Sequence, residues 1–153
     1  MIIPHPGGGV VLTIRALEVG LANATAVAAD PHQGHRHEDA RRAIVHLACA
    51  LIASHLRNHR PDAFGLLMTW RPPHAGLRPH GWMYAPGPVA LGNQLTATIT
   101  PYTDRLRPNN TEHWHPLCQV ISHNGGVYVL SLARVAALFP LPPGSPRTDT
   151  ATP

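Results

Sequence analysis

Residues 43–53 limit the possible folds of this chain most, because they are apolar at every position except His46. They lie within a longer stretch, residues 37–58, in which apolar side chains recur at helical spacing: Ile44, Leu47, Ala48, Leu51 and Leu56. Arg60 and Pro61 follow and favour the end of a helix. A helix that is apolar on nearly every side has to be covered on several sides. We therefore expect this helix to be central and packed on a sheet.

The residues before this helix are typical of a helix start. Asp30 can cap free backbone amides, Pro31 suits the first helical position, and Gln33 can reach back to the cap. Gly34 weakens this start, so the secure part of the predicted helix begins near residue 37.

Short apolar or alternating runs predict strands on both sides of the helix. Residues 10–17 and 21–28, with a turn at 18–20, are expected to form an opening hairpin. Residues 64–70 predict a buried strand, and residues 82–85 predict a short one.

The second half of the chain adds further strand signals. Residues 95–100 alternate strictly between apolar residues and threonine, which predicts a strand with one face on the core. Residues 117–122 and 127–130 are separated by Asn124 and Gly125, a strong hairpin turn signal. We therefore expect this hairpin to complete the sheet.

The elements together predict an α+β fold. A mixed or antiparallel sheet of about five to seven strands would pack on one main helix. Ser131 can cap a short last helix over residues 132–139. We expect residues 1–139 to form a single domain and the Pro-rich residues 140–153 to form a flexible tail.

The composition excludes several classes of function. All twelve basic side chains are arginine, and the absence of lysine excludes a Walker-type phosphate loop, a Schiff-base lysine and a Ser-Lys dyad. The formal net charge of +4 permits an anionic partner without requiring one. No window approaches the roughly 18 to 20 apolar residues of a membrane span, and the start lacks the features of a signal peptide. We expect a cytoplasmic protein without a membrane partner, with Cys49 and Cys118 as core residues.

The twelve histidines are the unusual feature of the composition, and several cluster with carboxylates. Imidazole and carboxylate groups are ligands that suit zinc, and a zinc site needs three or four of them from different segments. The candidate ligands are His32, His35, Asp39, His113 and His115. Exposed loop histidines are the simpler interpretation, so we expect no cofactor, with zinc as the alternative.

Part of this set resembles the zinc-ligand pattern of D-Ala-D-Ala metallopeptidases, SxHxxGxAxD followed by ExWH. The resemblance implies that His32, Asp39 and His115 bind zinc and that Glu112 is the general base. Three positions depart from the pattern: Asp30 replaces the serine, Gly34 comes one residue early, and His37 replaces the alanine. We do not assign the chain to that family.

Arginine, histidine and aromatic residues alternate between residues 70 and 84, and two more arginines lie in residues 101–116. Such a mixture can hold single-stranded nucleic acid, because arginine offsets phosphate charge and flat rings stack on bases. The same residues also suit a protein interface. The candidate surface comprises Trp70, Arg71, His74, Arg78, His80, Trp82, Tyr84, Arg105 and Arg107.

We expect function to lie in two loops, residues 71–81 and 101–116. The favoured interpretation is a small non-enzymatic binding or assembly domain whose partner is another protein or a second copy. The alternatives are a zinc-dependent hydrolase that uses the His, Asp and Glu cluster, and a domain that binds single-stranded nucleic acid.

Overall fold

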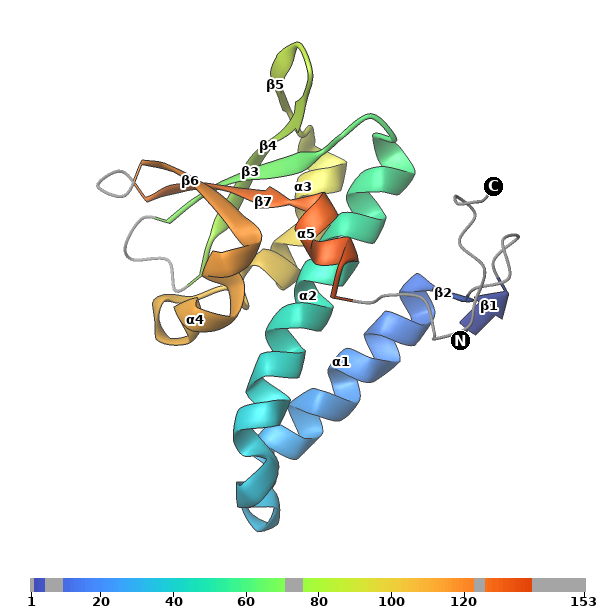
Figure 1. The fold of residues 1–153 in the computed structure, drawn as a ribbon, viewed down its shortest axis with the longest axis vertical. Helices are drawn as coiled ribbons and strands as arrows, with labels where there is room; N and C mark the ends of the chain where they lie inside the picture. The colour runs from blue at the N-terminus through green and yellow to red at the C-terminus, as the bar shows by residue number, and fades with distance from the viewer. Residues whose placement is uncertain (1, 5–9, 71–75, 123–125, 139–153) are drawn as a thin grey trace.

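The computed structural model describes residues 2–4, 10–70, 76–122 and 126–138, and it shows an α+β fold (Figure 1). A five-stranded antiparallel sheet packs against one long helix, α2 (His37–His59). The strand order is β5 (Gly87–Ala90), β4 (Arg78–Tyr84), β3 (Gly65–Thr69), β7 (Val127–Ser131), β6 (Cys118–Ser122). The predicted fold class is confirmed. The predicted tail, residues 140–153, lies outside the described residues. No helix in the described part of the chain has the length and apolar character needed to cross a membrane.

The predicted central helix is confirmed as α2, His37–His59. A 3-10 helix, Pro31–Arg36, precedes it, and the Asp30 side chain caps that helix by accepting from the His32 N–H at 2.9 Å. Between residues 40 and 56, eight side chains of α2 are buried: Ala40, Val45, Ala48, Cys49, Ala50, Leu51, Ile52 and Leu56. Covering an apolar segment on several sides requires several elements. The sheet and three further helices, α1 (Ile14–Ala29), α3 (Asn93–Thr103) and α5 (Leu132–Ala136), all contribute residues to the same core.

The strands of the sheet are β3 (Gly65–Thr69), β4 (Arg78–Tyr84), β5 (Gly87–Ala90), β6 (Cys118–Ser122) and β7 (Val127–Ser131). The strands predicted at 64–70, 117–122 and 127–130 are confirmed, and the last two pair antiparallel as a hairpin. Its predicted turn, Asn124-Gly125, lies outside the described residues. The predicted loop at 71–81 is partly wrong, because β4 begins at Arg78 and pairs with both β3 and β5.

The opening hairpin predicted over residues 10–28 is wrong, because Ile14–Ala29 forms a helix, α1. The Thr13 side chain caps this helix by accepting from the Ala16 N–H at 3.1 Å. Leu17 and Leu21 are one turn apart and are both buried in the core shared with α2. Figure 1 shows α1 and α2 side by side. Two short strands before α1, β1 (Ile2–Pro4) and β2 (Val10–Leu12), pair with each other outside the main sheet.

The strand predicted at residues 95–100 is also wrong, because Asn93–Thr103 forms a helix, α3. Its buried residues are Leu95, Ile99 and Thr103, which lie four apart on one helical face. The threonines that suggested strand alternation instead donate to the carbonyl four residues earlier. Those bonds run from Thr96 to Gly92, from Thr98 to Gln94 and from Thr100 to Thr96. Residues 95–100 therefore contribute no strand to the sheet.

The predicted loop at 101–116 contains the end of α3 and three short helical turns: Pro108–Asn110, α4 (Thr111–Trp114) and His115–Leu117. The chain then enters β6. After β7, Ser131 caps a short helix, α5 (Leu132–Ala136), by accepting from the Arg134 N–H, as predicted. Cys49 and Cys118 are both buried and unpaired, which confirms them as core residues.

Candidate functional site

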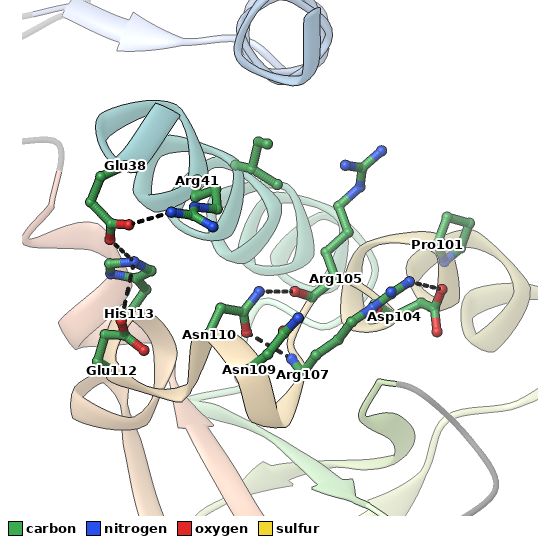
Figure 2. A pocket seen from close by; sticks show the side chains of 11 residues that line it. Glu38, Arg41, Pro101, Asp104, Arg105, Arg107, Asn109, Asn110, Glu112 and His113 are labelled. Atoms are coloured by element: carbon green, nitrogen blue, oxygen red, sulfur yellow. Dashed lines mark hydrogen bonds and ion pairs between the residues drawn. The ribbon is translucent and has the colours of Figure 1, made fainter. Parts of the chain in front are cut away.

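A cleft of about 650 Å³ lies between the N-terminal half of α2 and residues 101–113 (Figure 2). We call it the α2–α4 cleft. Glu38, Arg41 and Ile44 line it from α2. The opposite wall contributes the following residues: Pro101, Asp104, Arg105, Arg107, Asn109, Asn110, Glu112 and His113. One of the two loops expected to carry function therefore forms most of a concave surface.

One end of the cleft holds an imidazole between two carboxylates. His113 Nε2 lies 2.9 Å from Glu38 Oε2 and 3.9 Å from Glu112 Oε2. Glu38 also accepts from Arg41, at 3.0 Å. The His113 side chain is only 11% exposed, whereas those of Glu38 and Glu112 are 57% and 67% exposed. The imidazole is therefore held in place by its surroundings, while both carboxylates can reach solvent or a ligand.

A second histidine supports this end of the cleft from α2. Burial lowers the pKa of His46, and a hydrogen bond to the His113 backbone acts in the opposite direction. The charges of His113 and Arg42 lower the pKa of His46 further. His46 is thus favoured as a neutral group that joins α2 to α4.

The other end of the cleft is a network of hydrogen bonds within residues 104–110. Arg107 donates to the Asp104 carbonyl at 2.8 Å and to the Asp104 carboxylate at 3.3 Å. Asn110 accepts from the Arg107 backbone N–H at 2.8 Å and donates to the Arg105 carbonyl at 2.9 Å. These bonds fix the backbone of the segment, so the wall of the cleft is ordered by short-range contacts. Asn109 is exposed at the same wall.

Arg105 differs from Arg107 in direction. Its guanidinium extends away from Asn110 toward α1, where it donates to Thr25 Oγ1 at 3.4 Å (Figure 2). Nearby, Tyr102 donates to Glu18 at 3.4 Å, and burial together with the Glu18 charge raises the pKa of Tyr102. The Arg105 side chain thus reaches from the cleft to the contact between α1 and α3.

Among the described residues, Glu38, Glu112 and His113 are the one group of three metal-ligating side chains placed to share an ion, with ligand atoms within 4.8 Å of one another. No protein-family model, curated protein or solved structure matches this chain. The ligand set implied by the metallopeptidase resemblance, His32, Asp39 and His115, does not form such a group.

The predicted metal ligands are dispersed over the surface. His32 and His35 are exposed in the 3-10 helix before α2, and Asp39 is exposed and pairs with Arg42 at 2.7 Å. The His115 ring lies against Tyr128, with ring centroids 6.1 Å apart. Of the five predicted ligands, only His113 belongs to the group with Glu38 and Glu112.

Sequence reasoning missed Glu38, although one signal could have found it. Glu38 lies seven residues, or about two helical turns, before Val45. Val45 is fully buried, so the helical pattern directs Glu38 toward the same side of α2. The predicted ligand on this turn is its neighbour Asp39, which the metallopeptidase resemblance also implies.

The predicted Arg and aromatic surface is divided among separate places. Arg71 and His74 lie outside the described residues, and Arg78 is exposed on β4. His80 Nε2 lies 2.6 Å from Thr69 Oγ1. Trp82 is only 9% exposed.

The Trp82 and Tyr84 rings of this predicted surface pack against each other. The Arg60 guanidinium lies 5.7 Å from the Trp82 ring centroid, and the Tyr84 ring lies 4.8 Å from it. Arg105 and Arg107 line the α2–α4 cleft, which none of the predicted aromatic residues lines. The described residues of this set do not lie on one common surface. Binding of single-stranded nucleic acid therefore stays a prediction from composition.

Proposed function

We propose that this protein is a small non-enzymatic binding domain that acts through the α2–α4 cleft. The observation that supports this proposal is the placement of residues 104–113. They form one wall of a concave surface of about 650 Å³, opposite the N-terminal half of α2. Concave surfaces with a few fixed polar groups are the usual sites of ligand binding.

The charges of the cleft favour a ligand that carries both signs. Glu38 and Glu112 offer exposed carboxylates at one end, which can accept from an ammonium or guanidinium group. Asn109, and the one Arg107 guanidinium nitrogen that does not bond to Asp104, offer donors at the other end, where a carboxylate can bind. A short peptide segment of a partner protein, with a basic and an acidic side chain, satisfies both ends.

A matched pair of tryptophan substitutions tests this proposal. Asn109→Trp places a bulky ring in the cleft, and no side-chain hydrogen bond of Asn109 within the described residues would be lost. Asn58→Trp places the same ring on the exposed last turn of α2, away from the residues that line the cleft. Peptides selected from a random library on the full chain serve as probes, with affinity measured by calorimetry.

We expect Asn109→Trp to weaken peptide binding about tenfold or more, the loss of about 1.4 kcal/mol of binding free energy, and Asn58→Trp to leave it unchanged. Equal affinities for the two variants would contradict the proposal, because the selected peptides would then bind elsewhere. Selected sequences that lack charged residues would contradict the proposed ligand chemistry.

A second candidate function is the binding of a divalent metal ion by Glu38, Glu112 and His113. The specific observation is that their three ligand atoms lie within 4.8 Å of one another. One imidazole and two carboxylates suit zinc or manganese. A metal held by three protein ligands at the rim of a cleft would keep positions open for water, which a metal-dependent hydrolase requires.

Zinc titration of the full chain distinguishes this candidate. After dialysis against zinc, the unaltered protein should retain about one ion per chain by elemental analysis. His113→Ala should lose it, whereas His32→Ala should retain it, because His32 is exposed and outside the group. Retention by His113→Ala, or no retention by the unaltered protein, would exclude this metal site.

A further inference from the structure

The outer face of α1 is largely apolar although it is exposed. Exposed residues recur three or four apart along this helix, opposite Leu17 and Leu21, which are buried in the core shared with α2. They are Arg15, Glu18, Val19, Ala22, Asn23, Ala26 and Ala29. Only two of them carry a charge, whereas the solvent face of a helix is usually charged or polar. Val19 is one of two large hydrophobic side chains that are exposed in the described part of the chain, at 45%.

This face borders a groove of about 570 Å³ between α1 and the end of α3. Its lining includes Glu18, Ala22, Thr25 and Ala26 from α1, together with Tyr102 of α3 and Arg105. We call it the α1 groove. Figure 1 shows α1 at the edge of the helices, with α2 between it and α4. The groove and the α2–α4 cleft thus lie on different sides of the fold, and Arg105 is the described residue that lines both.

The described lining of the α1 groove carries one carboxylate and one guanidinium. Glu18 accepts from Tyr102 at 3.4 Å, and Arg105 donates to Thr25 Oγ1 at 3.4 Å. Both distances exceed the usual range for hydrogen bonds, so these contacts are weak. Neither Glu18 nor Arg105 belongs to an ion pair among the described residues. Both side chains can therefore bind an opposite charge from outside the chain.

The positions of these two charges suit a second copy of the same chain. Glu18 and Thr25 are seven residues apart, about 10.5 Å along the helix. With a twofold axis midway between them, beside Ala22, two α1 helices would lie antiparallel. Glu18 of each copy would then face Thr25 of the other, where the Arg105 guanidinium lies. A twofold axis makes each contact occur twice, so a surface that carries both charges at this spacing is complementary to itself.

The residues nearest this axis allow two helices to approach closely. Ala22 lies beside the axis and Ala26 is one turn from it, and both are exposed. Helix axes approach to about 8 Å where the side chains at the contact are small. We infer that this protein forms a twofold-symmetric dimer through α1, in which Glu18 of each copy pairs with Arg105 of the other. This interface goes beyond peptide binding in the α2–α4 cleft and does not rest on it.

Sedimentation equilibrium of the full chain over a range of concentrations tests the dimer. The unaltered protein should reach twice the chain mass of 16.5 kDa. Ala22→Glu places two like charges beside the axis and should weaken dimerisation about tenfold or more. Ala97→Glu is the matched control, because Ala97 is also exposed within a helix but does not line the α1 groove. It should leave the dissociation constant unchanged.

Reversal of the two charges tests the pairing itself. Glu18→Arg brings two guanidinium groups together across the interface, and Arg105→Glu brings two carboxylates together. Each single reversal should weaken dimerisation about tenfold, because like charges replace opposite ones at two symmetric places. The double variant restores opposite charges and should return the dissociation constant to within about threefold of the unaltered value.

A monomer at every concentration would overturn the inference. Equal dissociation constants for Ala22→Glu and Ala97→Glu would overturn it too, because the dimer would then use another surface. If the double variant dimerises no better than the single ones, Glu18 and Arg105 are not partners and the proposed axis is wrong. Peptide binding is a separate outcome, because Ala22 does not line the α2–α4 cleft and Asn109 does not line the α1 groove. Either property can therefore fail while the other holds.

Discussion

His113 Nε2 lies 2.9 Å from Glu38 Oε2, although 75 residues separate the two in the chain. The contact joins α4 to the first turn of α2 and closes one end of the α2–α4 cleft. Glu112, the neighbour of His113, lies farther from the same nitrogen, at 3.9 Å. Both carboxylates thus lie near one imidazole, but Glu38 is closer to it than Glu112. Substituting each in turn can therefore distinguish their contributions to stability.

Glu38→Ala should therefore destabilise the protein more than Glu112→Ala. Glu38 contacts both His113 and Arg41, yet it is 57% exposed, so screening by water limits the loss to about 0.5–1 kcal/mol. Glu112→Ala should change the free energy of unfolding by less than about 0.3 kcal/mol. Urea titration at low salt measures both values. Equal losses for the two variants would show that the shorter contact, from Glu38 to His113, is not the stabilising one.

The sequence allowed α2 to be predicted because one property dominates there. Its middle segment is apolar on nearly all sides. The helical spacing and the burial of this segment could therefore be predicted without knowing which elements pack on it. Strands β3, β6 and β7 were predictable for a similar reason, since each is a short apolar run next to residues that favour turns. The local sequence of each of these elements is therefore enough to predict it.

The failures at α1 and α3 have a different physical cause. Threonine and valine favour strands in isolation. They alternate with alanine near the end of α1, and threonine alternates with apolar residues in α3. In the structure, Leu17 and Leu21, one turn apart, bury one face of α1 in the core, and Leu95 and Ile99 do the same for α3. Tertiary contact overrides local preference there. Helical spacing from Val45 can indicate the side of α2 on which Glu38 lies, but its partner His113 is 75 residues away, and no local pattern reports that contact.

Ala97→Val tests the corrected assignment of α3 by the sign of its effect. Ala97 is exposed in the interior of this helix, so the substitution changes backbone preference more than packing. A β-branched residue costs about 0.5 kcal/mol relative to alanine in a helix, whereas it favours a strand. We expect the free energy of unfolding in urea to fall by about that amount. An increase would support the strand that the sequence pattern predicted.

The two cysteines should be unreactive in the folded protein. Burial raises the pKa of Cys118 to about 12, against a smaller lowering by Arg134, and burial also raises the pKa of Cys49. The thiolate is the reactive form, so little of it is present at pH 8. A thiol reagent should label neither cysteine in buffer and both in urea. Rapid labelling of one thiol in buffer would contradict the burial of that side chain.

The stability of the protein should fall as the pH drops below neutral, and His55 should account for part of the loss. The His55 ring stacks on Tyr102 with centroids 5.9 Å apart, and its Nε2 is buried without a hydrogen-bond partner among the described residues. Burial lowers the pKa of His55, while Glu18 raises it by a smaller amount. Protonation in the folded state would therefore leave a buried N–H without an acceptor.

The sign follows from proton linkage. The unfolded chain binds a proton at His55 near pH 6.5, whereas the folded chain binds it only at lower pH. The stabilisation from His55 is therefore complete above about pH 6.5 and is lost as the pH falls toward its folded pKa. Urea titrations at about pH 7.5 and pH 5 measure the free energy of unfolding that is lost between these two pH values. This loss should be smaller for His55→Phe than for the unaltered protein, because phenylalanine keeps a ring on Tyr102 but cannot titrate. His32→Phe removes an exposed imidazole and should lose as much stability as the unaltered protein. If the His55→Phe variant loses as much stability as the unaltered protein, the pH dependence arises at other groups. His46 is the next group to test, because burial lowers its pKa as well.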